Sequence, residues 1–193
     1  MNPILIALNS DAMGAGKSTV ASHLVMRHGF RLVKFAAPLK DMTRALLPHL
    51  GIPPRQVERH VEGDRKEIEI EGFKGLTTRR IMQTLGTEWG RDTIRPDFWT
   101  HIVHETVAAH LQAGNSVVID DMRFANEYDA VQLLGGTALR VWRPGAALVG
   151  GQHASEGELS RVPMGTITND STIENLQRLT DRIVERLRAN ESL

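Results

Sequence analysis

Apolar and polar positions follow one another in blocks along the chain, and the lengths of these blocks predict an α/β protein. Short apolar runs of strand composition cover 3–9, 30–35, 116–121, 137–142 and 165–168. Between them, apolar residues recur at three- and four-residue spacing, which is typical of amphipathic helices. Strands that alternate with helices favour a doubly wound, parallel sheet of five strands with helices on both faces.

Proline, threonine and glycine mark where the predicted helices begin and end. The clearest helix runs from Lys17 to His28 and is stopped by Gly29. We expect the helix that begins near Thr77 to end before Gly86. The predicted helix starts are Lys17, Pro38, Thr77 or Thr78, Pro96, Ala125 and Thr172.

The first apolar run leads into the segment 9–19, which has the sequence NSDAMGAGKST. A strand, a glycine-bearing turn and Gly-Lys-Ser at a helix start are typical of a phosphate-binding P-loop. Backbone N–H groups of the turn and the helix N-terminus would bind the anion. Lys17 would reach the β- and γ-phosphates of ATP, and the Ser18 hydroxyl would ligate Mg²⁺. The predicted ATP contacts in this loop are Ala12, Met13, Gly14, Ala15, Gly16, Lys17, Ser18 and Thr19.

Asp11 stands where the usual P-loop pattern has its first glycine. Aspartate tolerates turn geometry better than most residues, so we still expect the loop to form. Its carboxylate would repel a triphosphate unless it points away from the loop.

Two carboxylates follow the third apolar run, and parallel sheets bind ligands at this end of their strands. Asp120 or Asp121 can act as a Walker-B-like acid that holds Mg²⁺. Adjacent strand residues point to opposite sides, so one carboxylate should face the P-loop and the other a neighbouring segment. We assign Asp120 to Mg²⁺ together with Ser18, although the pattern leaves the alternative open. Arg123, on the same rim, would clamp a transferring or acceptor phosphate.

A polar helix face is predicted at Arg80, Gln83 and Thr87, which are three and four residues apart. Arginine binds phosphate in its fork, and glutamine can pair with a base edge in either sense. This face is therefore a candidate nucleotide acceptor site. Phe98 and Trp99 would form either a base-stacking wall or part of the core.

Composition narrows the class of protein. The 193 residues suit one domain, and 23 basic side chains balance 23 acidic ones, so no basic stripe indicates stable nucleic-acid binding. The absence of cysteine excludes disulfides and thiolate chemistry, and we expect a cytoplasmic protein. The apolar run 3–9 is too short to span a membrane. Among the eight histidines, only His101 and His104 have metal-like spacing, and we interpret them as surface residues.

Several strings together resemble the deoxynucleoside monophosphate kinases of tailed bacteriophages. They cover nearly the whole chain: FAAPLK at 35–40, the block from Arg80 to Trp99, DDMRFANE at 120–127, HASE at 153–156 and ITNDSTIE at 167–174. The resemblance implies a P-loop kinase fold over residues 1–193, with a helical acceptor-binding region at about 38–113 and a lid at about 143–163. It also implies ATP, Mg²⁺, a deoxynucleoside 5′-monophosphate acceptor and a homodimer, in host-cell cytoplasm if the chain is phage-encoded.

The resemblance also assigns roles to single residues. It implies that Asp121 and Arg123 act with Lys17 in catalysis, and that Arg143 and Asn169 lie on the ATP side. The implied acceptor contacts are Lys40, Arg80, Gln83, Thr87, Arg91, Trp99, Asp121, Arg123 and Trp142.

Three other functions fit a P-loop. The first is a kinase for another small acceptor, such as dephospho-coenzyme A or a sugar acid. A second is a kinase that acts on modified bases within DNA. A GTP-binding switch is disfavoured, because the sequence has no Asn-Lys-x-Asp string to recognise guanine.

Overall fold

The computed structural model of the chain describes residues 2–146 and 158–191. It divides into two compact units. Unit 1 comprises Met1–Phe35 and Val103–Leu193, and unit 2 is the continuous segment Ala36–Ile102. Unit 2 overlaps most of the region 38–113, where acceptor-binding helices were expected.

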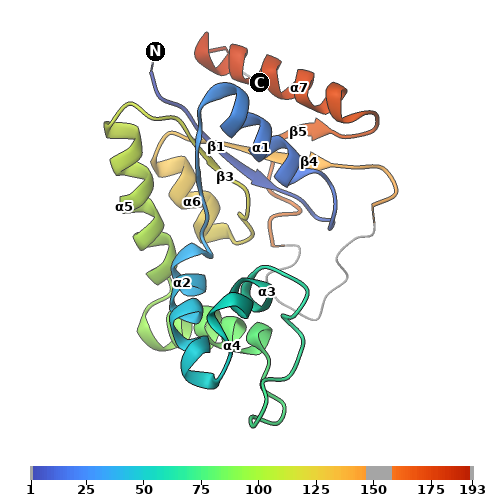
Figure 1. The fold of residues 1–193 in the computed structure, drawn as a ribbon. Coiled ribbons are helices and arrows are strands. Elements are labelled where there is room, and N and C mark those ends of the chain that lie inside the picture. Colours follow the sequence, from blue (N-terminus) through green and yellow to red (C-terminus); the bar gives the residue numbers. More distant parts are fainter. Residues whose placement is uncertain (1, 147–157, 192–193) are drawn as a thin grey trace. The chain divides into compact units, whose positions relative to one another are not determined.

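Unit 1 is built on a five-stranded parallel sheet, as predicted (Figure 1). Its strands lie in the order β2-β3-β1-β4-β5. All five residues of the central strand β1 are buried, which is typical of a strand covered on both faces. The strands are β1 (Leu5–Asn9), β2 (Arg31–Val33), β3 (Val117–Ile119), β4 (Thr137–Trp142) and β5 (Gly165–Thr168).

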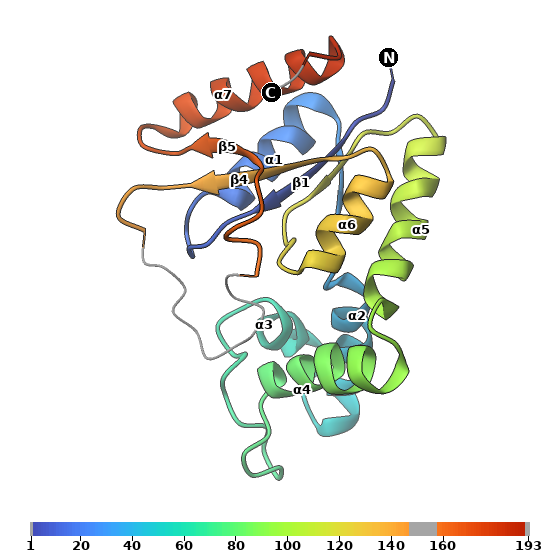
Figure 2. The same cartoon turned by 180° about the vertical axis from the view of Figure 1, so that it is seen from behind.

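Helices cover both faces of this sheet (Figures 1 and 2). One face carries α1 (Lys17–His28) and α7 (Ile173–Arg188). The opposite face carries α6 (Ala125–Leu133) and the C-terminal part of α5 (Phe98–Gln112). The apolar cluster under α1 and α7 includes Leu8, Leu24, Val118, Leu139 and Leu176. The cluster under α5 and α6 includes Val103, Val107, Ile119, Met122 and Val131.

Both predicted boundaries of α1 and the predicted start of α7 are confirmed. Gly29 adopts a left-handed backbone with φ of 72°, and its N–H donates to the carbonyls of Leu24 and Val25. Thr172 precedes α7, and its hydroxyl accepts from the N–H of Asn175 at 3.2 Å. None of the helices within the described ranges has both the length and the apolar character needed to cross a membrane.

Unit 2 is helical and has its own apolar core, formed by Leu47, Val57, Val61, Ile70 and Ile81. Three of these residues, Val57, Val61 and Ile70, come from the stretch 55–75, which is otherwise rich in charged side chains. Its elements are α2 (Ala37–Leu46), η1 (Leu47–Leu50), η2 (Pro54–Gln56), α3 (Val57–Val61), α4 (Thr78–Thr84), the π-helix η3 (Leu85–Ile94) and the start of α5.

The α-helix that begins near Thr77 ends at Thr84, before Gly86 as predicted, but the helical structure does not stop there. Thr77 does cap α4, and its hydroxyl accepts from the N–H of Arg80, but the chain then continues through Gly86 as the π-helix η3. Trp99 explains the change. Its indole Nε1 donates to the carbonyl of Gly86 at 2.9 Å, and the ring packs so closely on Gly90 that a Cβ there would overlap it.

Candidate active site

The segment between β1 and α1 has the backbone that the P-loop pattern predicts. Gly14 and Gly16 have φ of +69° and +111°, a region that side chains with a Cβ rarely adopt. Lys17 is the first residue of α1 and is half-buried, and Ser18 after it is exposed. The loop therefore passes directly into a helix N-terminus, where free N–H groups favour an anion.

Two side chains from the C-terminal part of the sequence donate hydrogen bonds to carbonyl groups of this loop. Asn169, which follows β5, donates its amide Nδ2 to the carbonyl of Ala15 at 2.9 Å. The Nη1 atom of Arg143, which follows β4, lies 3.4 Å from the carbonyl of Gly14 and donates to it. Both residues had been expected on the ATP side, and the structure places both beside the loop.

The two loop glycines provide a matched test of this packing. A Cβ at Gly16 would lie 2.7 Å from Asn169 Nδ2 and 3.2 Å from Leu176 Cδ2, whereas a Cβ at Gly14 meets no described atom within 4 Å. Gly14→Ala should cost roughly 1–2 kcal/mol of stability from backbone strain alone. Gly16→Ala should cost more and also weaken nucleotide binding, because it displaces Asn169.

Urea unfolding and calorimetric titration with ATP would measure the two effects. Equal losses of stability and of nucleotide affinity in the two variants would show that Asn169 does not support the loop.

Asp11 is paired, which reduces the repulsion that its carboxylate would impose on a triphosphate. Its Oδ2 lies 3.5 Å from Nε of Arg140 on β4. A second contact fixes Arg140, whose Nη2 donates to the carbonyl of Leu159 at 2.5 Å. The sequence pattern gave no sign of Arg140, because its partner is remote along the chain.

Lys17 lies among charges of both signs. Burial of its ammonium group, followed by the nearby Arg123 guanidinium, lowers the pKa of Lys17. The carboxylates of Asp120, Asp11 and Asp121, in decreasing order of effect, raise the pKa of Lys17 and partly compensate. The loop lysine, the strand-end carboxylates and Arg123 therefore form one electrostatic cluster within unit 1.

Asp120 is buried at the end of β3 and faces Lys34, which follows β2. Lys34 Nζ lies 3.2 Å from both carboxylate oxygens and donates to Oδ2. The other oxygen, Oδ1, accepts no hydrogen bond from the described residues, and the same holds for the buried Oδ1 of Asn9 at the end of β1. Two buried oxygens without a hydrogen bond at the ends of neighbouring strands are an unusual arrangement, because buried polar atoms are normally satisfied; Asp120 Oδ1 has only its ionic contact with Lys34 among the described residues.

These oxygens match the ligand chemistry of Mg²⁺, which binds carboxylate, carbonyl, hydroxyl and water oxygens. Of the two strand-end acids, Asp120 has the larger effect on the pKa of Lys17. By their chemistry, Ser18, Asp120 and Asn9 are the residues that could hold a Mg²⁺ ion. Neither Asn9 nor Lys34 stood out in the sequence analysis.

Asp121 and Arg123 are positioned by backbone contacts. Asp121 Oδ1 accepts from the N–H of Phe35 at 2.9 Å. The buried carboxylate of Glu127 on α6 accepts from the N–H groups of Arg123 and Phe124, at 2.7 and 3.1 Å. Glu127 thereby fixes the backbone that carries the exposed Arg123 side chain, whose charge acts on Lys17.

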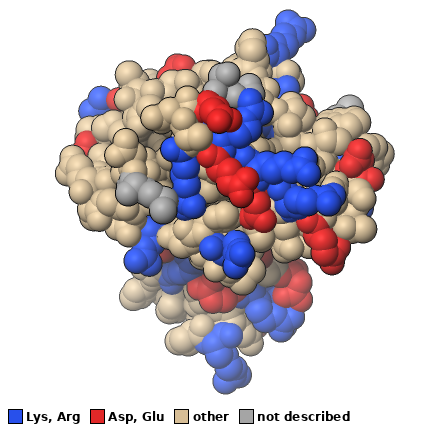
Figure 3. Space-filling view, turned by 90° about the horizontal axis from the view of Figure 1, so that it is seen from above, with Lys and Arg blue, Asp and Glu red and all other residues tan. Residues whose placement is uncertain are grey.

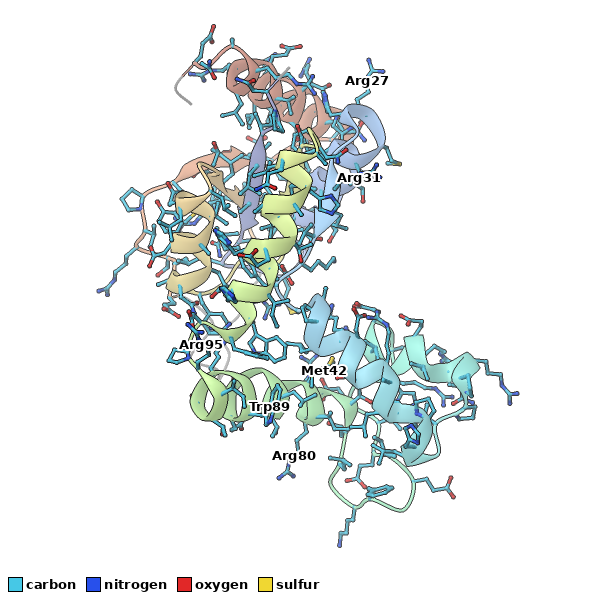
Figure 4. All side chains as sticks on the ribbon, turned by 90° about the vertical axis from the view of Figure 1, so that its left-hand side faces the viewer. Arg27, Arg31, Met42, Arg80, Trp89 and Arg95 are labelled. Carbon is cyan, nitrogen blue, oxygen red and sulfur yellow. The ribbon has the colours of Figure 1, made fainter. Side chains whose placement is uncertain are left out.

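Unit 2 carries most of the predicted acceptor residues, and several differ from expectation. Arg80 projects outward from α4 (Figure 4), and its Nη1 lies 3.4 Å from the carbonyl of Gly75. Lys40 Nζ donates to both carboxylate oxygens of Glu62, at 2.9 and 3.0 Å. Thr87 lies in the π-helix, so α-helical spacing does not set its direction relative to Gln83 on α4.

Trp99 belongs to the interior of unit 2. It is 2% exposed and packs with Trp89 and Phe98, so its ring presents no open face to a base. The core alternative is therefore the correct one. Arg91 is half-buried, and Trp142 at the end of β4 in unit 1 is 49% exposed. Much of the expected lid at about 143–163 falls on 147–157, outside the described residues.

The parallel sheet, the P-loop and the strand-end acid are typical of the P-loop nucleotide-binding fold. Two solved structures share this fold: protein TT1252 from Thermus thermophilus and the dephospho-CoA kinase from Campylobacter jejuni. The match to TT1252 has a TM-score of 0.52 and 17% sequence identity, and it covers 97% of the present chain and 99% of the TT1252 chain. The second has a TM-score of 0.51 and 11% identity, with 98% of each chain covered.

The chain belongs to the deoxynucleotide monophosphate kinase family, whose model matches residues 52–179. A protein of Acanthamoeba polyphaga mimivirus with the provisional name deoxynucleotide monophosphate kinase is 33% identical over 184 residues. This match covers 89% of the present chain and 91% of the mimivirus protein. The protein is therefore a phosphotransferase, as the resemblance to phage kinases had implied.

Proposed function

We propose that this kinase transfers the γ-phosphate of ATP to the 5′-phosphate of a deoxynucleoside monophosphate, with Mg²⁺ as its metal ion. The observation that supports this most directly is the charge cluster at the P-loop, where Lys17 lies with Arg123 and Asp120. Family membership supports the class of acceptor. The likeness to a dephospho-CoA kinase concerns the fold alone and favours no other acceptor.

Each group of unit 1 has a role that follows from its chemistry. Lys17 would stabilise negative charge on the β- and γ-phosphates as the phosphoryl group leaves. Arg123 would bind the transferring or acceptor phosphate through its guanidinium fork. Mg²⁺, held by Ser18, Asp120 and Asn9, would neutralise phosphate charge. Arg143 and Asn169 support the ATP-binding loop, and the acceptor contacts of Asp121 and Trp142 stay predictions.

In unit 2 we propose Arg80 for the acceptor phosphate and Gln83 for a base edge. Among the described residues, the exposed Arg80 guanidinium contacts only the carbonyl of Gly75, at 3.4 Å, so it can turn toward an anion. Lys40 would have to exchange Glu62 for a phosphate to contribute. Acceptor contacts of Thr87 and Arg91, and the homodimer, stay predictions.

The charge distribution favours a free nucleotide over a base within DNA. Proteins that bind DNA need several Lys or Arg contacts along the phosphate backbone. On the face seen in Figure 3, Lys and Arg lie interleaved with Asp and Glu. Arg44 and Arg59 in unit 2 likewise pair with acids, Glu58 and Asp64. A free monophosphate needs only a few arginines.

We therefore expect rapid phosphorylation of at least one free deoxynucleoside monophosphate and no transfer to DNA. The assay follows radiolabelled γ-phosphate from ATP into each free monophosphate and into single- and double-stranded oligonucleotides, with Lys17→Met as the background. Label in the oligonucleotides with every free monophosphate inert would contradict the proposed acceptor. No transfer to any of these acceptors would contradict the function itself.

A further inference from the structure

Three side chains that commonly bind metals converge on the face of unit 1 that carries α1 and α7. His23 and His28 belong to α1, and Asp181 belongs to α7. Their Nε2 atoms lie 2.7 and 2.6 Å from the same Oδ1 of Asp181. One potential ligand atom from each residue lies within 4.8 Å of the other two. None of the three belongs to the P-loop or to the strand-end acids.

Tertiary packing brings these residues together. Two positions five residues apart on an α-helix differ by about 140° in direction, so His23 and His28 do not share a face by spacing alone. His28 is the last residue of α1, and its ring meets that of His23 edge to face with 5.7 Å between centroids. Leu24 of α1 and Leu176 of α7 pack in one apolar core, which holds the two helices in place.

The two histidines of this cluster are largely shielded from solvent, whereas the aspartate is partly exposed. The side chains of His23 and His28 are 12% and 13% exposed, whereas that of Asp181 is 36% exposed. Two imidazole nitrogens and one carboxylate oxygen form a donor set that suits Zn²⁺ and related transition metals. Mg²⁺ and Ca²⁺ prefer sites made of oxygen atoms. The exposed side leaves room for water as a fourth ligand.

We propose that His23, His28 and Asp181 bind one divalent transition-metal cation, with Zn²⁺ as the expected ion. Ligand atoms around a tetrahedral Zn²⁺ lie about 3.3 Å apart, given metal–ligand bonds of about 2.0–2.1 Å. The two nitrogen–oxygen distances are shorter than this, so the carboxylate must withdraw slightly to admit the ion. Asp181 can do so by rotating its side chain, because it lies on the exposed side.

The position of this site gives the ion a structural role. Carbonyl groups at the C-terminus of a helix carry partial negative charge, which favours a cation near His28. The ion would join the end of α1 to α7 through ligands from both helices. Because α1 begins at Lys17, the ion would stabilise the helix that carries the P-loop at its other end.

The test uses the full chain, stripped of metal by a chelator and kept in excess Mg²⁺ to occupy oxygen-rich sites. Co²⁺ should produce the visible absorption of a tetrahedral nitrogen–oxygen site, and Zn²⁺ should displace it with a stoichiometry of one. Free Zn²⁺ at a hundredfold excess over its Kd should raise the Tm by about 5–10 °C. The absence of a Co²⁺ spectrum or of saturable Zn²⁺ binding would overturn the proposal and leave a hydrogen-bonded cluster.

Near-isosteric variants assign the ligands. His23→Gln, His28→Gln and Asp181→Asn should each weaken Zn²⁺ binding more than about tenfold, since even outer-shell partners of a metal are worth that much. The double variant His23→Gln/His28→Gln should lose binding, whereas His104→Gln, which alters a histidine on α5 near Glu105, should bind as the unmodified chain does. Far-UV circular dichroism without metal checks that each variant is folded.

Unchanged Zn²⁺ affinity in the double variant would overturn the assignment. Lys17→Met retains all three ligands and should bind Zn²⁺ normally. Metal binding is therefore tested independently of the proposed kinase activity.

Discussion

Lys17→Met is expected to abolish phosphoryl transfer while the fold stays intact. Lys17 is half-buried and lies beside Arg123 and Asp120, in surroundings where water screens its charge only partly. A preorganised charge of this kind contributes several kcal/mol to stabilising the transition state, so kcat should fall by a factor of about 10³ or more. Methionine keeps most of the length and apolar character of the side chain, so the packing around it should change little.

A coupled assay for ADP release would measure kcat, and thermal unfolding would report stability. Lys74→Met, at an exposed lysine of unit 2, is the matched control and should keep normal turnover. Near-normal turnover in Lys17→Met would contradict the P-loop assignment. Lost activity with a strongly lowered Tm would instead point to a structural role for Lys17.

Asp120→Asn is expected to have the second largest effect, lowering kcat by a factor of about 10²–10³ and weakening the response to Mg²⁺. The substitution keeps the shape of a buried side chain and removes its charge. In the unmodified protein Lys34 Nζ lies 3.2 Å from this carboxylate, and the substitution leaves Lys34 without its ionic partner. Stability should fall by about 1–3 kcal/mol, less than for a fully buried pair because Lys34 is partly exposed.

The double variant Lys34→Met/Asp120→Asn separates these two effects. Removal of both charges should recover much of the lost stability, because no buried charge remains unpaired. Activity should stay low, because the Mg²⁺ ligand is still missing. Titrations of kcat against Mg²⁺ would show this directly. A normal kcat and an unaltered Mg²⁺ dependence in Asp120→Asn would exclude Asp120 as the metal ligand.

Local sequence signals were sufficient for much of unit 1. The helix from Lys17 to His28 was predicted with both boundaries, since a P-loop precedes it and Gly29 ends it. The strand Thr137–Trp142 was also correct, because a glycine pair precedes it and its residues suit a buried strand. Such signals act over a few residues, so they do not depend on contacts with distant parts of the chain.

Features that depend on distant residues were missed. The π-helix at Leu85–Ile94 was not predicted, because the Trp99 side chain that packs on Gly90 and donates to the carbonyl of Gly86 follows later in the sequence. The same limitation applies to charges. The Asp11–Arg140 pair, the Lys34–Asp120 pair and the cluster of His23, His28 and Asp181 each join segments far apart in the sequence.

The division of the chain has a consequence for how the protein folds. Strands β2 and β3 are neighbours in the sheet, yet the whole of unit 2 lies between them in sequence. If this segment were still unfolded, pairing β2 with β3 would require the closure of a long flexible loop, which has an entropic cost. Non-local pairings of this kind slow folding. Unit 2 has an apolar core of its own and is one continuous segment, so it can collapse first and shorten the effective loop. Early folding of unit 2 would thus accelerate formation of the sheet that carries the P-loop.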